Sequence, residues 1–268
     1  MTAAPEIPGV AWLPPSGQAD LPKQTVHVWQ ISLAAQEDTV RHLAAVLAAD
    51  EQARAARFNF AQDSRRYIAV RGALRLLLAG YLHQVAGTLR FGTTEYGKPF
   101  LLRADGLPDT EIAFNVSHSH ELALLAFTRG MRVGVDVERV RPELAEGHIA
   151  ERFFSPREVT VLRGLPQAEQ PAAFFRCWTR KEAFVKARGE GLSLPLHSFD
   201  VSLAPDEPAA LLDVATDPAE AQRWTLRALT PTLPGYMAAL AVEGRDVALA
   251  CYQVAELALL SRLARAEQ

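Results

Sequence analysis

The 268-residue sequence predicts an α+β protein, built as a pseudo-dimer of two similar halves in one chain. Segments with strand alternation and segments with helical spacing are mixed along the whole length. Both halves also share an outline, in which an Arg-Phe pair (Arg57-Phe58, then Arg152-Phe153) precedes helices that lead into strands and a hairpin. A repeated outline of this kind indicates an internal duplication.

We divide the chain into three parts. Residues 1–24 are rich in proline and are expected to be irregular, because proline interrupts regular structure. Residues 25–130 form an N-terminal α+β half, and residues 131–268 form a C-terminal α+β half. We expect the active site to lie at the interface of the two halves.

Local patterns define the expected elements. From residue 26 to residue 137 they are a strand at 26–31, helices at about 34–57 and 62–85, a Gly-Pro turn at 94–99, a strand at 112–118, and a hairpin of 122–127 with 131–137. In the C-terminal half, Ser155 and Glu158 form a capping box that starts a helix. A further helix from about 171 to 188 ends at Gly189, and a hairpin joins 236–242 to 246–254.

Composition excludes several classes of protein. The chain is 49% hydrophobic and 22% charged, which excludes a disordered chain, and its net charge of −3 disfavours a general nucleic-acid binder. It has two cysteines, no signal-peptide layout at its start, and no apolar run of the ~20 residues that span a bilayer. We therefore expect a cytoplasmic protein with neither a membrane nor a nucleic-acid partner.

Two segments carry carboxylates that point together. Asp136 and Glu138 lie two apart on a predicted strand and share one face. Trp178, Glu182 and Lys186 lie four apart and share one helix face. Taken separately, these are ordinary features of a solvated surface, but three oxygen ligands together (Asp136, Glu138, Glu182) suit Mg²⁺. Because Mg²⁺ in proteins is commonly shared with substrate phosphates, the set predicts a phosphate-bearing substrate.

Candidate phosphate contacts lie upstream. Gly97-Lys98 places a positive charge on a tight turn, and the segment from Asn115 to His118 offers a hydroxyl, an imidazole and turn amides. Further positive charge could come from arginines of the helical region: Arg54, Arg57, Arg66 and Arg75. Each signal is weak by itself, since a single histidine between strands is more often structural.

Together these segments resemble the 4′-phosphopantetheinyl transferases of the Sfp type. The similarity covers residues 54–199 strongly. It rests on motifs that occur in the family's order: Tyr96-Gly97-Lys98-Pro99, Phe114 to Ser119, Val133 to Glu138, Phe154 to Glu158, Trp178 to Ala183 with Lys186, and Gly191 to Leu196. The stretch before Arg57 departs from some relatives, because it carries arginines in place of lysines.

The resemblance implies transfer of the 4′-phosphopantetheine arm of coenzyme A to a serine of an apo carrier protein (acyl, peptidyl or aryl), with release of adenosine 3′,5′-bisphosphate. It implies Mg²⁺, with Mn²⁺ as a substitute, and a monomer. Asp136, Glu138 and Glu182 would hold the metal, Glu182 would be the base, and Lys186 would steady the pyrophosphate; Glu138 could act through water. The implied coenzyme A contacts are Arg54, Thr93, Thr94, Glu95, Tyr96, Gly97, Lys98, Asn115, Val116, Ser117, His118, Asp136, Glu182 and Lys186.

Other interpretations stay open. A Mg²⁺-dependent phosphohydrolase of coenzyme A or nucleotides would use the same residues, and a non-catalytic coenzyme A-binding module would need fewer. We expect Glu158 and Trp178 to be structural. Lysine is rare here, with four against 24 arginines, and three of the four lie in the motifs (Lys98, Lys181, Lys186). We interpret this as a need for a compact ammonium group at a crowded phosphate site. An arginine-rich rim could also steer an acidic carrier protein.

Overall fold

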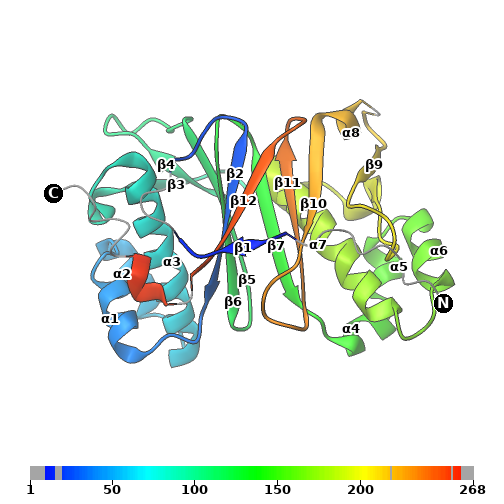
Figure 1. The fold of residues 1–268 in the computed structure, drawn as a ribbon, viewed down its shortest axis with the longest axis horizontal. Coiled ribbons are helices and arrows are strands. Elements are labelled where there is room, and N and C mark those ends of the chain that lie inside the picture. Colours follow the sequence, from blue (N-terminus) through cyan, green and yellow to red (C-terminus); the bar gives the residue numbers. More distant parts are fainter. Residues whose placement is uncertain (1–9, 16–19, 218, 255, 261–268) are drawn as a thin grey trace.

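Two β-sheets pack face to face at the centre of the molecule, and one long helix covers the outer face of each sheet (Figure 1). The computed structural model describes residues 10–15, 20–217, 219–254 and 256–260. Helix α3 (Ala61–Leu82) packs on a five-stranded sheet of order β1-β12-β2-β6-β5, and helix α7 (Gln170–Arg188) packs on a three-stranded sheet of order β10-β11-β7. In the described part of the chain, no helix is both long and apolar enough to cross a membrane.

The strands are β1 (Trp12–Leu13), β2 (Thr25–Ser32), β3 (Arg90–Thr93), β4 (Pro99–Leu102), β5 (Ile112–Ser119), β6 (Leu122–Arg129), β7 (Val133–Arg139), β8 (Phe199–Val201), β9 (Leu211–Val214), β10 (Trp224–Leu229), β11 (Tyr236–Glu243) and β12 (Ala248–Val254). The remaining α-helices are α1 (Glu37–Ala44), α2 (Ala49–Ala55), α4 (Pro142–Glu146), α5 (Ile149–Phe153), α6 (Pro156–Gly164) and α8 (Glu220–Arg223). Single 3₁₀ turns lie at Ala86–Thr88, Gly191–Ser193, Leu196–Ser198 and Leu257–Leu259.

Strand order shows the duplication. In the N-terminal half, β2 is followed by short helices, the long helix α3, the β3–β4 pair, and then β5 and β6, which line up as β2-β6-β5. In the C-terminal half, β7 is followed by short helices, α7, the β8–β9 pair, and then β10 and β11, which line up as β7-β11-β10. The two halves therefore repeat one topology, and the predicted α+β pseudo-dimer is confirmed.

Both predicted hairpins are wrong in their pairing. Strand β6 pairs with β5 and β2, whereas β7 pairs with β11 in the other sheet. Likewise, β11 pairs with β10 and β7, whereas β12 crosses to lie parallel to β2. In each case the strand that follows a short glycine-containing turn joins the other sheet. Apolar runs and turn residues do not predict which sheet a strand joins. The division at residue 130 stays a prediction, but β12 belongs by pairing to the N-terminal sheet.

Other element predictions need smaller corrections. The helix expected over 34–57 is two helices, α1 and α2, separated by residues 45–48. Within residues 1–24, Trp12 and Leu13 form a short strand parallel to β12, whereas the other described residues up to Lys23 are in no helix or strand. Residues 1–9 and 16–19 lie outside the described residues. The strand at β2, the turn before Pro99, the capping box of α6 and the end of α7 at Gly189 are confirmed.

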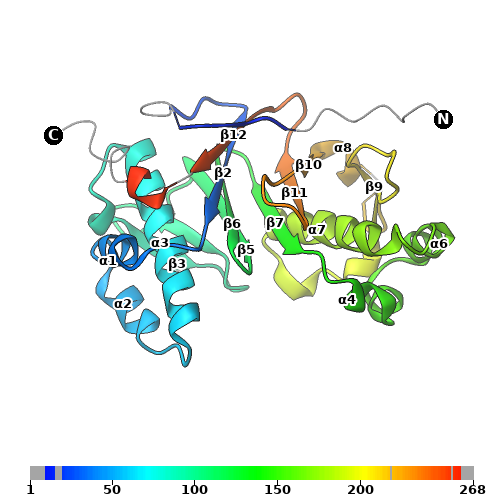
Figure 2. The ribbon, with the colours of Figure 1, turned by 60° about the horizontal axis from the view of Figure 1, so that its bottom comes forward.

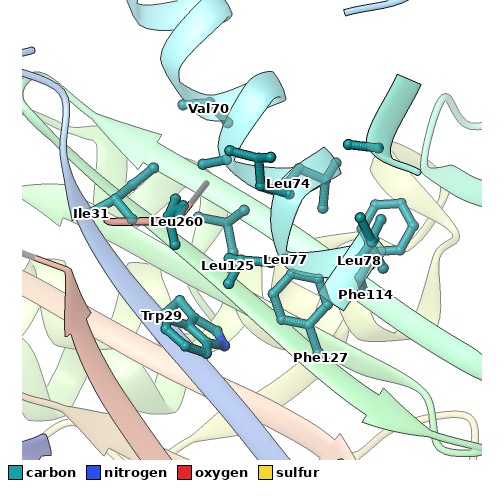
Figure 3. Packing of buried hydrophobic residues seen from close by; sticks show 14 of the residues in the cluster. Trp29, Ile31, Val70, Leu74, Leu77, Leu78, Phe114, Leu125, Phe127 and Leu260 are labelled. Carbon is teal, nitrogen blue, oxygen red and sulfur yellow. The ribbon is translucent and has the colours of Figure 1, made fainter. Parts of the chain in front are cut away.

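Three apolar layers hold the four-layered structure together. One lies between α3 and the five-stranded sheet (Figure 3), one between the two sheets, and one between the three-stranded sheet and α7. Strand β6 contributes to two of them, because Leu125 and Phe127 face α3 whereas Leu124 and Ala126 face the other sheet. Burial of both faces explains its uninterrupted apolar sequence.

A buried polar cluster joins α3 to β2. Trp29 Nε1 donates to the Tyr81 hydroxyl at 2.7 Å, and His27 Nδ1 lies 2.9 Å from the same oxygen. The Tyr81 hydroxyl is then free to donate to His27 Nδ1, which requires a neutral imidazole. Burial lowers the pKa of His27 to about 4 from its usual 6.5. Charging His27 therefore opposes the folded state.

We predict that His27 makes the protein sensitive to acid. Because the pKa of His27 is lower in the folded than in the unfolded chain, its contribution is intact above about pH 6.5 and is lost as the pH falls toward 4. Between pH 7 and pH 4, the free energy of unfolding should fall by about 3 kcal/mol more in the wild type than in His27→Asn. Denaturant unfolding of both proteins across this range measures the difference, and equal losses would contradict the prediction.

Candidate functional site

Strand β7 carries the two carboxylates that the sequence places on one face. Val135 and Val137 are fully buried between the two sheets, so the alternating residues Asp136 and Glu138 point to the opposite face. Asp136 is 2% exposed, whereas Glu138 is half-buried. The predicted orientation of this strand is confirmed.

The outer edge of β7 is covered by side chains in place of a neighbouring strand's backbone. Strands β5 and β7 lie side by side where the two sheets meet (Figure 2), a place we call the β5–β7 junction. Three side chains of β5 accept hydrogen bonds from alternate backbone N–H groups of β7: Asn115 Oδ1 from Val135 at 2.9 Å, Ser117 Oγ from Val137 at 3.3 Å, and Ser119 Oγ from Arg139 at 3.2 Å. These bonds satisfy an edge that would otherwise be unpaired.

The two serines of this junction also orient the carboxylates. Ser117 Oγ donates to Asp136 Oδ1 at 2.8 Å, and Ser119 Oγ donates to Glu138 Oε2 at 2.9 Å. Each hydroxyl therefore accepts from the backbone of β7 and donates to a carboxylate of the same strand. Residues of the N-terminal half thus fix the acidic side chains of the C-terminal half.

Helix α7 brings the remaining charged groups to the same place. Lys186 Nζ donates to Asp136 Oδ1 at 2.6 Å and to Ser117 Oγ at 3.0 Å. The close approach of α7 to β7 depends on Gly134, because a Cβ atom there would lie 2.1 Å from the backbone oxygen of Ala183. Trp178, one turn before Glu182, stacks on Phe174 with ring centroids 6.0 Å apart and plays the packing role expected of it.

These residues line an open pocket of about 350 Å³ at the β5–β7 junction. The pocket is lined by Val116, Ser117, His118, Asp136, Glu138, Trp178, Glu182 and Lys186. A second pocket of about 280 Å³ shares Glu182 and Lys186 and extends toward the turn at Tyr96 to Pro99 and the residues after α7. Most of the predicted site residues are therefore brought together.

Burial and mutual repulsion shift the ionisation of the pocket. Burial raises the pKa of Glu182, and Asp136 raises it further while Lys186 opposes the shift. Burial and Asp136 likewise raise the pKa of Glu138. The pKa of His118 is lowered by burial and by Lys186. Three crowded carboxylates create a demand for positive charge, and Lys186 forms an ion pair with one of them, Asp136.

The donor set fits a hard cation. Asp136 Oδ2 is buried and has no hydrogen-bond partner, which leaves one oxygen of the most buried carboxylate free to bind a ligand. Oxygen donors without histidine or cysteine suit Mg²⁺. Among the described residues, no three acidic, histidine or cysteine side chains converge closely enough to hold a metal ion as they stand.

The residues that the resemblance assigns to the nucleotide end of coenzyme A are less closely grouped. Thr93 ends β3, and the turn after it is closed by bonds from Gly97 N to Thr94 O and from Thr94 N to Lys98 O. Glu95 and Tyr96 are exposed on this turn. The Lys98 ammonium does not face open solvent but donates to three backbone carbonyls. Burial lowers the pKa of Lys98 to about 8, and Arg132 adds to this shift.

Two of the arginines suggested as phosphate contacts differ in their surroundings. Arg54 is exposed on α2, with its guanidinium carbon 5.3 Å from the centre of the Tyr67 ring. Arg75 is 1% exposed and is held by Glu51 and by the carbonyl of Ala86. The suggestion that Arg75 supplies charge to a phosphate is therefore wrong, because its guanidinium is used inside the N-terminal half.

The buried pair Glu158–Lys181 is also structural. Lys181 Nζ lies 2.8 Å from Glu158 Oε2 and donates to the carbonyls of Leu196 and Phe199, and its side chain is fully buried. The other Glu158 oxygen accepts from Val201 N at 2.8 Å. The structural role expected of Glu158 is confirmed. The suggestion that Lys181 serves a phosphate site is wrong, because its three donors are engaged away from the pocket.

Sequence reasoning missed the role of Ser119 and assigned Asn115 only to ligand binding. The signal was present in the sequence, since Asn115, Ser117 and Ser119 alternate along a strand and must share one face. What the pattern does not reveal is that this face meets the edge of another strand.

Comparison with known proteins identifies the family. Residues 31–129 match the family model "4′-phosphopantetheinyl transferase, N-terminal", and residues 132–241 match that of the "4′-phosphopantetheinyl transferase superfamily". The chain therefore belongs to the 4′-phosphopantetheinyl transferases and is an enzyme of that class. The resemblance inferred from the motifs is confirmed.

Two relatives by sequence agree with this assignment. The chain is 41% identical over 233 residues to the 4′-phosphopantetheinyl transferase HetI of Nostoc, an alignment that covers 87% of this chain and 94% of HetI. It is 34% identical to the 4′-phosphopantetheinyl transferase Sfp of Bacillus subtilis, with 64% of this chain and 72% of Sfp covered. A solved structure of Helicobacter pylori holo-[acyl-carrier-protein] synthase in complex with coenzyme A is 20% identical; the match covers 42% of this chain and 99% of that chain, with a TM-score of 0.33.

We predict that Gly134→Ala separates α7 from β7. The added methyl group would meet the backbone of Ala183, which cannot move like a flexible side chain, so the variant should lose about 1–3 kcal/mol of stability together with most of its activity. Gly164→Ala is the matched control, because nothing lies within 4 Å of a Cβ atom there. Denaturant unfolding and a transferase assay measure both variants. Equal behaviour of the two would show that close packing at Gly134 does not set the site.

Proposed function

We propose that the pocket at the β5–β7 junction is where the 4′-phosphopantetheine arm of coenzyme A is transferred to a serine of an apo carrier protein, with Mg²⁺ as the cofactor. The observation that carries this proposal is the joint placement of Asp136, Glu182 and Lys186 around one pocket to which both halves contribute. Family membership supplies the reaction, and the pocket supplies charged groups suited to it.

Asp136, Glu138 and Glu182 would hold the metal, with the free Asp136 Oδ2 as one ligand. When bound, Mg²⁺, or Mn²⁺ in its place, would neutralise negative charge on the pyrophosphate of coenzyme A. Glu138 is less buried than Asp136 and is held by Ser119, so it would complete the site directly or through a water molecule.

Glu182 would take the proton of the carrier serine. Its carboxylate lines both pockets, which is the placement that a general base for this transfer needs. As the serine oxygen bonds to the phosphorus next to the pantetheine, the bond to the bridging oxygen breaks and adenosine 3′,5′-bisphosphate leaves. Lys186 would steady the pyrophosphate and the negative charge that grows on the leaving oxygen.

The adenosine 3′-phosphate end would lie against the N-terminal half. His118 lines the main pocket, and the turn residues Tyr96 to Pro99 line the second one. Exposed Arg54 would reach the 3′-phosphate from α2. Arg66 lies close enough to lower the pKa of His118 and would add positive charge there. Asn115, Val116 and Ser117 would form the floor of the site.

The remaining parts of the proposal concern partners. One chain supplies both halves of the pocket, which supports action as a monomer. The cysteines that the structure describes, Cys177 and Cys251, are free and buried, which fits a reducing cytoplasmic setting. An acidic carrier protein would be steered by exposed arginines at the rim, and salt should weaken that association.

We predict that Glu182→Gln removes most transfer activity while the protein stays folded. Glutamine keeps the shape of the side chain but can neither accept the serine proton nor bind a cation strongly, so kcat should fall by about 10²–10⁴-fold. Glu207→Gln is the control, because Glu207 is an exposed loop residue away from the pocket. Mass spectrometry of an apo carrier protein incubated with coenzyme A measures both. An unchanged rate for Glu182→Gln would refute its assigned role.

We predict that release of adenosine 3′,5′-bisphosphate requires the carrier. With the protein, Mg²⁺ and coenzyme A alone, nucleotide release should stay at the background rate, because no serine is present to accept the arm. Adding an apo carrier protein should start release in step with carrier modification. Chromatographic measurement of the nucleotide decides the question, and carrier-independent release would favour the alternative of a phosphohydrolase.

A further inference from the structure

Lys98 crosses from the N-terminal half to the C-terminal half and ends on backbone oxygens. Its ammonium donates to the carbonyls of Lys186 at 2.6 Å, Val133 at 3.1 Å and Ala187 at 3.4 Å. An ammonium group has three donors and no acceptor, so these contacts can use all of its hydrogen-bonding capacity. The ammonium is therefore occupied by protein and does not point freely into the pocket.

All three carbonyls lack a regular partner. Lys186 and Ala187 lie in the last turn of α7, where carbonyls have no N–H group four residues further along the helix. Val133 begins β7, and its carbonyl lies on the same outer edge as the N–H groups of Val135 and Val137. Lys98 thus satisfies both the end of the helix and the start of the strand. A positive charge at a helix C-terminus is also favourable.

The approach of Lys98 is built into the surrounding backbone. Its stem passes Gly189, the left-handed residue that ends α7, where an added Cβ atom would lie 3.5 Å from Lys98 Cδ. On the other side, Lys98 belongs to a closed turn, with its own N–H donating to Thr94 Oγ1 at 3.1 Å. Both ends of the side chain are therefore held in place.

We propose that Lys98 is a positioning residue, which holds the end of α7 against β7 and so sets the reach of the Lys186 side chain. The same residue whose carbonyl is bound by Lys98 sends its own ammonium to Asp136. A shift of the last turn of α7 would move Lys186 away from Asp136 and from the pyrophosphate. This inference rests on the proposed function, in which Lys186 acts on the pyrophosphate.

The proposal differs from a direct contact between Lys98 and the 3′-phosphate and adenosine end of coenzyme A, which the family resemblance implies. To bind a phosphate, the Lys98 ammonium would have to leave carbonyls that have no other hydrogen-bond donor among the described residues. The three donors of an ammonium spread from a single nitrogen, whereas the donors of the arginine guanidinium lie in one plane on separate nitrogens. The geometry therefore also explains why a chain that otherwise favours arginine keeps lysine here.

The test compares Lys98→Met, Lys186→Met and the double variant in transfer from coenzyme A and from 3′-dephospho-coenzyme A. We expect Lys98→Met to lower kcat by about 10–100-fold, because small displacements of a catalytic group have effects of this size. Its preference for coenzyme A over the dephospho form should match that of the wild type. The double variant should be no slower than Lys186→Met, since residues that act as a unit are not additive. Lys98→Arg should not restore the rate.

Three results of the activity measurements would overturn the proposal. A preference for coenzyme A that collapses in Lys98→Met would show a direct phosphate contact. Full rescue by Lys98→Arg would show that only the charge matters. Multiplied losses in the double variant would show that Lys98 acts independently of Lys186. Lys23→Met, an exposed lysine outside the site, is the control.

Folding and function are checked separately. Thermal unfolding establishes that each variant is folded, and Lys98→Gln replaces Lys98→Met if the latter is not. Failure of both to fold would contradict the proposal, because Lys98 would then hold the fold and not the site. If the proposed function itself is wrong, the wild type will not modify the carrier or Lys186→Met will be fully active. Both results differ from a failure confined to Lys98.

Discussion

The site depends on how the outer edge of β7 is satisfied. The side chains of Asn115, Ser117 and Ser119 accept hydrogen bonds from backbone N–H groups of β7. Lys98 donates a hydrogen bond to the first carbonyl of the same strand. Strand β5 reaches this edge through its side chains and not through its backbone. The two sheets therefore do not merge into one at this edge. Space remains at the β5–β7 junction, and the backbone N–H groups of Val135, Val137 and Arg139 on this edge are still paired. The same four residues come from the N-terminal half, so neither half can build the pocket alone.

This arrangement links packing to chemistry. Ser117 holds the backbone of β7 and the Asp136 carboxylate at once, so the acidic group cannot move without the strand. Helix α7 brings Lys186 and Glu182 to the opposite side of the pocket, over Gly134. Charges that would repel one another in a buried place are thus fixed at short range. Such crowding is tolerated where function requires it, and it supplies a reason for a cation to bind.

Local signals in the sequence predicted local structure well. The capping box of Ser155, the end of α7 at Gly189 and the shared face of Asp136 and Glu138 all depend on neighbouring residues, and all are present. The motifs likewise located the family and most of the pocket. Pairing between strands was not predictable, because β7 and β12 each follow a tight turn yet leave for the other sheet. That choice depends on the packing of the two halves.

The partners of the rare lysines were also not predictable from the sequence. Their rarity drew attention to three positions in the motifs, but two of these lysines, Lys98 and Lys181, satisfy clusters of backbone and carboxylate oxygens within the protein. Only Lys186 faces the acidic pocket. Composition indicated that a compact ammonium was needed, whereas the partner of each one depended on contacts between residues far apart in the chain.

The most direct test of the central claim is a crystal structure of the protein with coenzyme A and Mn²⁺, with the metal located by its anomalous scattering. The account predicts one strong peak in the pocket at the β5–β7 junction, bound by Asp136 and Glu182 and by the pyrophosphate of coenzyme A, with Lys186 beside it. A metal peak and a pyrophosphate bound elsewhere on the protein, with this pocket empty, would contradict it.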